Sequence, residues 1–426
     1  MKRSETKGVS LWHNSLKLIT AGAFVQAVAF LLLPLIGRLY TREEIGLLSL
    51  FLGLSGVISI AGNARYDQAV LIAPKQTHSQ ILSAIAVRVN IWISILLIPL
   101  IYFLLPLVSE TNYRNLGAYI WLLPPVVFLS GIYNLLVSYH NAEKRFESMG
   151  KSQVVQGILN NGGKVGFGFA GGGVLGLQVS YILGLVGGIV SLWRHVPVKT
   201  IRKISTRRRR LILAKHYGNF PRNGIIQSMV DNLSGSILVL MLPMKFTDEI
   251  VGVVAMALML TARPLGIVSE AVSRVFCRKI IEMKEQHLSN VQYIHRFLKR
   301  YVWVVIPFVM LVIFGTKPAI NIFLGEKWLP TATVIIAMVS YLPTWFLSSV
   351  FNVIPDLLFK QRAFMYLQIV LLLLQAGTIL IGMKFLSFEG FLWLYFGVRT
   401  LDCLTQFTWF YLLLKKDERK SLAKIR

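Results

Sequence analysis

Seven charged residues lie within long apolar runs of this 426-residue sequence, where their charges would act in a medium of low dielectric. The four cations are Arg88, Lys164, Arg263 and Arg399. The three acids are Asp231, Glu270 and Asp402. A charge near the centre of a bilayer costs about 2.5–3.5 kcal/mol even on the mildest scales, so each side chain needs a partner, water or a ligand. The cations are therefore candidates for binding an anion, and the acids for binding H⁺ or Na⁺.

Some of these residues also have a purely structural interpretation. Arg399 and Asp402 are three residues apart on one helical face, so they could form an ion pair within a helix and do nothing else. Lys164 and Glu270 lie near the ends of their apolar runs, from which long side chains can reach water. The sequence leaves both interpretations open.

The stronger candidates are the charged residues that lie about half a span deep among apolar neighbours, namely Arg88, Asp231 and Arg263. Arg263 also precedes Pro264, which lacks the N–H that would continue a helical hydrogen-bond ladder. Pro343 predicts a similar bend further along the chain. Polar stripes at helical spacing accompany these charges and indicate a shared polar interior.

The elements that position these residues are membrane-spanning helices. The sequence is 55% hydrophobic and 15% charged, whereas soluble domains are about 45–50% apolar and about 25% charged. A helix needs about 20 apolar residues to cross a bilayer. We predict twelve spans near residues 16–36, 45–63, 81–107, 117–139, 154–171, 174–192, 222–243, 250–273, 301–315, 332–354, 364–383 and 390–414. The ninth of them is short.

The basic residues predict the orientation of these spans. With residues at span edges counted in their loops, the N-terminus, the loops after even-numbered spans and the C-terminus hold 34 of the 45 Lys and Arg. The opposite loops hold 7, and 4 lie within spans. Lys and Arg collect in cytoplasmic loops, so both termini are predicted to be cytoplasmic. This bias also explains the net charge of +26 without nucleic acid as a partner.

An internal repeat predicts two halves. Residues Leu39–Gly46, which read LYTREEIG, are similar to Lys245–Gly252, which read KFTDEIVG, and the two threonines are 206 residues apart. Six predicted spans separate the copies, so the halves share one orientation and form parallel repeats. We therefore predict an N-terminal six-helix bundle at 1–205 and a C-terminal six-helix bundle with a short basic tail at 206–426.

Several motifs of enzymes and ATPases are missing from the sequence. The stretch Gly157–Val165 contains GILNNGGKV, but its spacing and its final Val depart from a phosphate-binding loop. The seven histidines form no HExxH pattern, and no nucleophile elbow is present. We therefore expect no catalytic residue, no bound metal and no cofactor, and a transport process driven by an ion gradient or by the substrate's own gradient.

Several segments carry a resemblance to a known family. They are Gly22–Gln26, Leu33–Thr41, Glu44–Gly46 and Arg65–Val70, with Phe220-Pro221 at the start of the seventh span and Val251-Gly252 in the eighth. With these segments the chain resembles the polysaccharide-transporter branch of the multidrug/oligosaccharidyl-lipid/polysaccharide exporter superfamily. The members of that branch are bacterial O-antigen, capsule and exopolysaccharide flippases.

The resemblance implies an all-α polytopic membrane protein in which two six-helix bundles surround a central cavity that opens alternately to each side. It implies a substrate, an undecaprenyl-diphosphate-linked oligosaccharide, that crosses a bacterial inner membrane from the cytoplasmic to the periplasmic leaflet. The implied partners are membrane lipids, a polysaccharide polymerase and a chain-length regulator. Cations in a low dielectric suit the diphosphate, but the family pattern assigns this role to none of Arg88, Lys164, Arg263 and Arg399.

Two other functions remain as alternatives. A multidrug exporter of the same superfamily would share the architecture, but its cavity would be dominated by acids that bind cationic drugs. The four cations against three acids, and the motif segments above, favour the flippase. A membrane polysaccharide polymerase or ligase would need a large outer loop, whereas the longest predicted outer loop, 316–331, is short.

Overall fold

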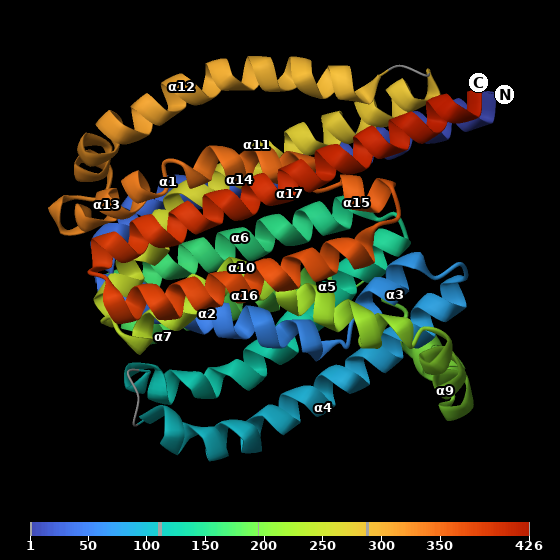
Figure 1. The fold of residues 1–426 in the computed structure, drawn as a ribbon. Helices are drawn as coiled ribbons and strands as arrows, with labels where there is room; N and C mark the ends of the chain where they lie inside the picture. The colour runs from blue at the N-terminus through green and yellow to red at the C-terminus, as the bar shows by residue number, and fades with distance from the viewer. Residues whose placement is uncertain (1, 110–112, 195, 287–288, 426) are drawn as a thin grey trace. The chain divides into compact units, whose positions relative to one another are not determined.

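The computed structural model describes residues 2–109, 113–194, 196–286 and 289–425 (Figure 1). This part of the chain is helical nearly throughout and contains no strand, which confirms the predicted all-α fold. The chain divides into two compact units, Met1–Gly252 and Val253–Arg426. The division into bundles at 1–205 and 206–426 stays a prediction.

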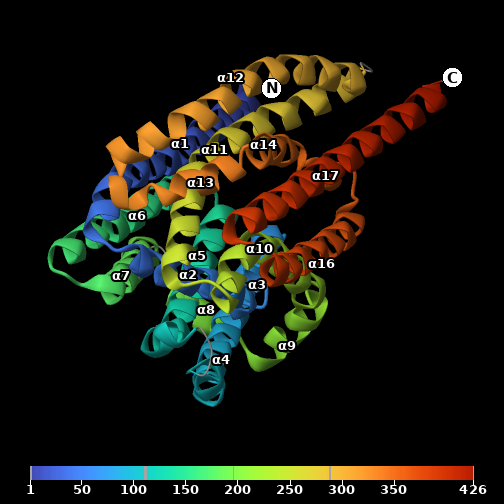
Figure 2. The same cartoon turned by 60° about the vertical axis from the view of Figure 1, so that its left-hand side comes forward.

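The first unit contains ten α-helices and the start of an eleventh. The α-helices are α1 (Lys2–Leu39), α2 (Arg42–Gly62), α3 (Tyr66–Ile72), α4 (Gln76–Ser109), α5 (Leu123–Ala142), α6 (Phe146–Phe169), α7 (Gly173–Trp193), α8 (Val198–Ile204), α9 (Arg207–His216), α10 (Ile225–Met241) and α11 (Asp248–Glu285). Short turns of other helix types are η1 (Arg114–Leu122), η2 (Phe220–Gly224) and η3 (Leu242–Met244). The α6 helix packs against both α1 and α7 (Figure 2).

The second unit contains the rest of α11 and the helices that follow it. These are α12 (Asn290–Phe323), η4 (Glu326–Trp328), α13 (Pro330–Ala337), α14 (Tyr341–Phe351), α15 (Ile354–Leu357), α16 (Gln361–Phe385) and α17 (Phe388–Ile425). The α17 helix packs against α14 and α16 (Figure 2). The core of the second unit holds the aromatic residues Phe276, Phe351, Phe364 and Phe410. The ring centroids of Phe276 and Phe351 are 4.3 Å apart.

Within the described residues, nine helices are long and apolar enough to span a membrane, or ten if the bent pair Glu326–Ala337 and Tyr341–Leu357 is one span. The predicted span 390–414 falls within α17, and 154–171 overlaps α6 but extends two residues past its end; neither helix is among these nine. The count of twelve therefore stays a prediction. The ninth span is not short as predicted, because α12 continues through flanking charged residues to a length of 34 residues.

Local signals in the sequence explain where several helices begin and bend. Thr41 caps α2, because its side chain accepts a hydrogen bond from the Glu44 N–H at 3.2 Å while the Glu44 carboxylate accepts one from the Thr41 N–H at 2.8 Å. A bend of 62° lies between α13 and α14, close to Pro343, where the sequence predicts one. By contrast, α11 continues through Pro264 without a break.

The two copies of the sequence repeat contact each other inside the first unit. A Cβ atom added to Gly252 would lie 1.7 Å from the carbonyl oxygen of Arg42, and one added to Gly46 would lie 2.2 Å from that of Asp248. The contact is reciprocal, because Arg42 and Gly46 each lie 206 residues before their counterparts Asp248 and Gly252. Arg42 Nη1 also lies 3.4 Å from Glu249 Oε1. Only glycine permits so close an approach of two helix backbones.

Candidate functional site

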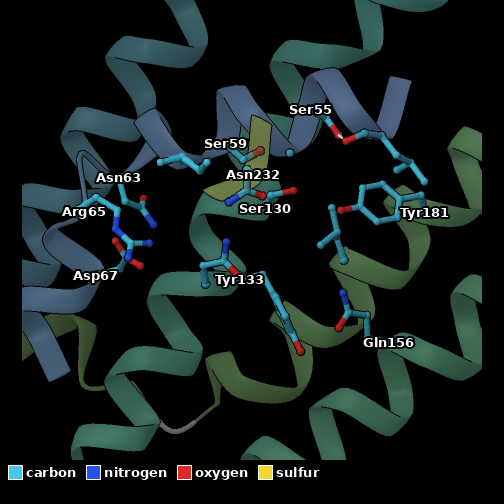
Figure 3. A pocket seen from close by; sticks show the side chains of 15 residues that line it. Ser55, Ser59, Asn63, Arg65, Asp67, Ser130, Tyr133, Gln156, Tyr181 and Asn232 are labelled. Carbon is cyan, nitrogen blue, oxygen red and sulfur yellow. Dashed lines mark hydrogen bonds between the residues drawn. The ribbon is translucent and has the colours of Figure 1, made fainter. Parts of the chain in front are cut away.

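A polar cavity of about 490 Å³ lies within the first unit (Figure 3). Its lining residues come from α2, the turn after α2, and the helices α3, α5, α6, α7 and α10. They are Leu52, Ser55, Gly56, Ser59, Ile60, Asn63, Arg65, Asp67, Ser130, Tyr133, Asn134, Gln156, Tyr181, Leu185 and Asn232. Hydroxyl and amide groups dominate this lining, although most of these helices are apolar enough to cross a membrane.

The α2 helix supplies one side of the cavity because its small and polar residues recur at helical spacing. Leu52, Ser55, Ser59 and Asn63 are three or four residues apart, so they lie on one face of the helix. The facing residues include Ser130 of α5 and Asn232 of α10. In Figure 3, Asn63 lies with Arg65 and Asp67 at one side, and Tyr181 lies across the cavity from them.

A strained turn between α2 and α3 places a cation and an acid at the cavity. Ala64 and Arg65 have φ values of 45° and 59°, in the left-handed region that favours glycine. Such a conformation costs on the order of 1–3 kcal/mol per residue and is typical of functional turns. The turn is held by hydrogen bonds from the Ala64 N–H to the Ala61 carbonyl at 2.7 Å and from the Tyr66 N–H to the Asn63 carbonyl at 3.0 Å.

Asp67 is 7% exposed and carries the acidic group of the cavity. Burial raises the pKa of the Asp67 carboxyl, and the positive charge of Arg65 and hydrogen bonds from the backbone oppose this shift. With one cation and one acid, the charged groups of the lining balance each other. The cavity thus offers mainly uncharged hydrogen-bonding groups.

Asn63 leaves one hydrogen-bonding atom unused at the cavity. Its Nδ2 donates a hydrogen bond to the Gly131 carbonyl at 2.8 Å, and the residue is 3% exposed. Its Oδ1 has no hydrogen-bond partner among the described residues. A buried acceptor of this kind costs free energy unless water or a ligand satisfies it.

The predicted residues of the first unit lie away from the cavity lining. Arg88 is exposed on α4. Lys164 is buried on α6, where its backbone carbonyl accepts a hydrogen bond from Tyr40 Oη at 2.6 Å. Asp231 is exposed on α10, next to the lining residue Asn232.

Two of the predicted residues of the second unit come together. Arg399 Nη1 lies 3.8 Å from Asp402 Oδ2, and Arg399 Nη2 donates a hydrogen bond to Tyr341 Oη at 3.2 Å. The Arg399 guanidinium also lies over the Tyr341 ring, 5.3 Å from its centroid. Asp402 Oδ2 accepts a further hydrogen bond from Gln375 Nε2 at 2.9 Å. Arg399 and Asp402 therefore form an ion pair within one helix, which is the structural interpretation that the sequence had allowed.

The other two predicted residues of the second unit are exposed on α11. Arg263 lies near the middle of the helix, one residue before Pro264. Glu270 forms an ion pair with Arg274 one turn later. Among the residues that the structure describes, no group of three His, Cys, Asp or Glu side chains could hold a metal ion.

The sequence predicted a polar interior, but it did not predict the residues that line this cavity. Arg65 and Asp67 belong to the motif segment Arg65–Val70, which did not by itself indicate a cavity, and Ser59 and Asn63 belong to none of the predicted sites. The signal that could have found them is the run of small and polar residues at helical spacing in α2, which is otherwise strongly apolar. The seven charged residues that were predicted from their depth in a span are instead distributed over both units.

Comparison with known proteins identifies the family. Residues 19–333 match the sequence model of a family that is described as "polysaccharide biosynthesis protein". No curated protein matches the sequence. The fold is similar to that of the lipid II flippase MurJ in its inward closed conformation, with a TM-score of 0.69, 14% identity, and coverage of 98% of this chain and 92% of that one.

Two further structures have a similar fold. A transporter of the MOP superfamily from Pyrococcus furiosus matches with a TM-score of 0.63 and 14% identity over 95% of each chain. A MATE structure in the bent conformation matches with a TM-score of 0.54 and 14% identity over 96% of each chain. Since the family model covers more than half of the sequence, the chain belongs to the polysaccharide biosynthesis protein family and has the fold of the multidrug/oligosaccharidyl-lipid/polysaccharide exporter superfamily.

Proposed function

We propose that this protein is a flippase that moves an undecaprenyl-diphosphate-linked oligosaccharide across a bacterial inner membrane by alternating access. The direction is from the cytoplasmic to the periplasmic leaflet, for O-antigen, capsule or exopolysaccharide synthesis. Membership of the polysaccharide biosynthesis family and the likeness to a lipid II flippase support this proposal. The likeness to transporters also supports a protein that moves its substrate without chemical change.

The polar cavity is the observation that carries the proposal. A sugar presents hydroxyl groups that both donate and accept hydrogen bonds, and the serine, asparagine and glutamine side chains of the lining do the same. The orphaned Oδ1 of Asn63 is ready to accept a hydrogen bond from such a hydroxyl. The polyprenyl tail would remain in the lipid, where it needs no polar contact.

Arg65 is our candidate for the group that attracts the diphosphate in the first unit, because it is the cation of the cavity lining. In the second unit Arg263 keeps the role predicted for it, because its side chain is exposed on α11. Arg399 is less suited, since its guanidinium is engaged with Asp402 and Tyr341. Arg88 and Lys164 lie outside the lining, so their predicted role in binding substrate is not supported by the cavity.

For the coupling ion we propose H⁺ or Na⁺, bound by Asp231 or Glu270. Both acids are exposed on α-helices of candidate spans, Glu270 in its surface pair with Arg274, whereas Asp402 is buried beside Arg399. We further propose that both termini are cytoplasmic, and that a polymerase and a chain-length regulator act on the flipped product. Transport into proteoliposomes under an imposed H⁺ or Na⁺ gradient tests the coupling. Equal rates with and without either gradient would indicate facilitated movement.

The central test is flipping of a defined lipid in proteoliposomes that contain the purified chain. The probe is a fluorescent undecaprenyl-diphosphate-linked disaccharide, and its loss from the outer leaflet is followed by a membrane-impermeant quencher. Ser59→Leu and Asn134→Leu fill the cavity and remove hydrogen-bonding groups, so each should slow flipping by about tenfold or more. Arg65→Gln should do the same, and Arg65→Lys should restore part of the rate because it keeps the charge.

Thr405→Leu is the matched control, because Thr405 is an exposed residue of α17 whose hydroxyl donates a hydrogen bond within its own helix, to the Leu401 carbonyl at 2.8 Å. This variant should flip the probe at the wild-type rate. The multidrug alternative predicts instead that the chain moves a cationic dye such as ethidium and leaves the lipid probe in place. That result would overturn the proposal.

A further inference from the structure

The segment between α7 and α10 is the most basic part of the chain. From Arg194 to Arg222 the sequence contains ten Lys and Arg residues and no Asp or Glu. It includes α8 and α9, and α9 begins with the four arginines Arg207–Arg210. The polar cavity makes no use of these charges.

One face of α9 packs against other helices of the first unit. Leu213 and Tyr217, four residues apart, are buried in a cluster with Leu82 and Ile85 of α4. Tyr66 Oη of α3 also donates a hydrogen bond to the Ala214 carbonyl at 3.4 Å. The helix therefore has a defined place against α3 and α4, which a free linker would lack (Figure 1).

The opposite face of α9 combines cations with exposed apolar side chains. Leu211 is 63% exposed and Ile212 is 59% exposed. Arg208 and Lys215, both exposed, lie three or four residues from them and thus on the same face. Large apolar side chains beside cations suit the boundary between lipid headgroups and hydrocarbon, where each kind of group finds its preferred medium.

Like charges also gather where α9 meets α4. Arg88 is exposed on α4 and lies close enough to Arg210 for the two charges to repel. Burial, followed by the positive charges of Arg88 and Arg207, lowers the pKa of the Arg210 guanidinium, which still stays charged at neutral pH. Within the described part of the chain, no acidic side chain lies within 4 Å of Arg88 or of Arg207–Arg210. Among the described residues, the cluster therefore has no acidic side chain in direct contact with it.

We propose that the exposed face of α9, together with Arg88, binds the phosphate headgroups of anionic phospholipids at the membrane surface. The arginines contact the phosphates, and Leu211 and Ile212 enter the acyl region beneath them. Bound lipid would supply the missing negative charge and hold α9 against α4. This inference places Arg88 at the membrane surface, in place of the mid-span depth and the substrate site that the sequence predicted for it.

The test is lipid retention by the full-length chain, measured by native mass spectrometry after exchange into phosphatidylglycerol or phosphatidylcholine. The wild type should retain phosphatidylglycerol about tenfold better than phosphatidylcholine, because only the former carries a net negative charge. The triple variant Arg207→Gln, Arg208→Gln, Arg209→Gln should lose most of this preference. Arg88→Gln, on another helix, should lose part of it.

The matched control removes the same charge elsewhere. Arg278→Gln, Lys279→Gln and Arg296→Gln replace three exposed cations of α11 and α12, two of which pair with Glu282. This control should keep the wild-type preference. An equal loss in both triple variants would mean that charge alone matters, and an unchanged α9 variant would mean a linker without a lipid site. Either result would overturn the proposal.

A competition experiment separates the lipid from the flippase substrate, which also carries phosphate. Undecaprenyl diphosphate added at a low molar ratio should leave bound phosphatidylglycerol in place, because the proposed site is a surface for abundant headgroups. Displacement by one equivalent of undecaprenyl diphosphate would assign the arginines to the substrate and overturn the lipid proposal. Retention is measured without transport, so its result is independent of the proposed flipping.

Discussion

The cavity of the first unit and the Arg399 cluster of the second unit both place charged and amide groups among apolar helices, but they differ in what surrounds those groups. In the second unit, Arg399 contacts Asp402 and Tyr341, and Gln375 donates to the Asp402 carboxylate. Tyr395, Phe396 and Cys403 around them are nearly fully buried. In the first unit, the polar groups line about 490 Å³ of open space.

Two buried amide side chains, Gln375 and Asn63, illustrate the difference between the two regions. Gln375 is 1% exposed and Asn63 is 3% exposed. Each donates one hydrogen bond, and each has a carbonyl oxygen without a partner among the described residues. Gln375 donates to a charged carboxylate inside a packed cluster, whereas Asn63 donates to a backbone carbonyl at the edge of a cavity. We infer that the first amide serves stability and the second serves binding.

Asp402→Ala should have the largest effect on the stability of the chain. The substitution leaves the largely buried Arg399 side chain, which is 12% exposed, without a carboxylate. Such a loss costs about 3–5 kcal/mol in fully buried pairs, which is the upper end of what we expect here. We expect a large fall in the unfolding free energy, measured by denaturant titration in detergent micelles. The double variant Arg399→Met, Asp402→Leu should recover most of it, because it removes both charges and keeps apolar volume. A single variant as stable as the wild type would contradict the role given to this pair.

Gln375→Leu should have the next largest effect. The leucine has a similar volume but removes the hydrogen bond to Asp402, and bonds to charged groups contribute about 1.5–3 kcal/mol. The same titration measures the loss. Flipping per folded molecule should stay at the wild-type level, because Gln375 lies in a packed cluster. A variant that keeps its stability but loses transport would move Gln375 into the functional machinery.

Much of the fold could be predicted because hydrophobicity and proline act locally. The apolar runs correctly predicted helices along the chain, and Pro343 marked the bend next to α14. The ninth span was wrong in length, since a charged residue ends an apolar run but need not end a helix, as α12 shows. The sequence shows the repeat around Gly46 and Gly252, but it did not predict that the two copies would contact each other.

The site was harder to predict because a buried charge and a functional charge look alike in a sequence. The depth of Arg399 and Asp402 in an apolar run predicted a functional role, yet the two side chains form an ion pair with each other within the second unit. Ser59 and Asn63 are uncharged and ordinary in composition, and only the packing of several helices reveals that they face open space. Such packing depends on contacts between residues far apart in the chain, which local patterns do not specify.

Asn63→Leu sharpens the comparison from the other side. It removes one hydrogen bond to a neutral carbonyl, which contributes about 0.5–1.5 kcal/mol, so the fall in unfolding free energy should be smaller than that of Gln375→Leu. Flipping of the lipid-linked probe should nevertheless drop by about tenfold or more, since the acceptor offered to the sugar is gone. If the two amide variants changed stability and transport in the same proportion, the distinction between the two regions would fail.

Asp67→Asn should have the smallest effect on stability and the clearest dependence on pH. Because burial raises the folded-state pKa of Asp67 above its ordinary value of 3.8, the protonated carboxyl favours the folded state. This contribution is fully present below pH 3.8 and is lost as the pH rises through the higher folded-state pKa. Thermal unfolding at a series of pH values should therefore show wild type and variant nearly equal in acid. Near neutral pH the variant should melt slightly higher, since the lost attraction to Arg65 offsets much of the gain.

The exposed Asp356→Asn of the second unit is the control and should follow the wild type throughout. An Asp67 variant that melts lower than the wild type at neutral pH would mean that attraction to Arg65 outweighs burial, and that the cavity holds a firm ion pair like the one at Arg399.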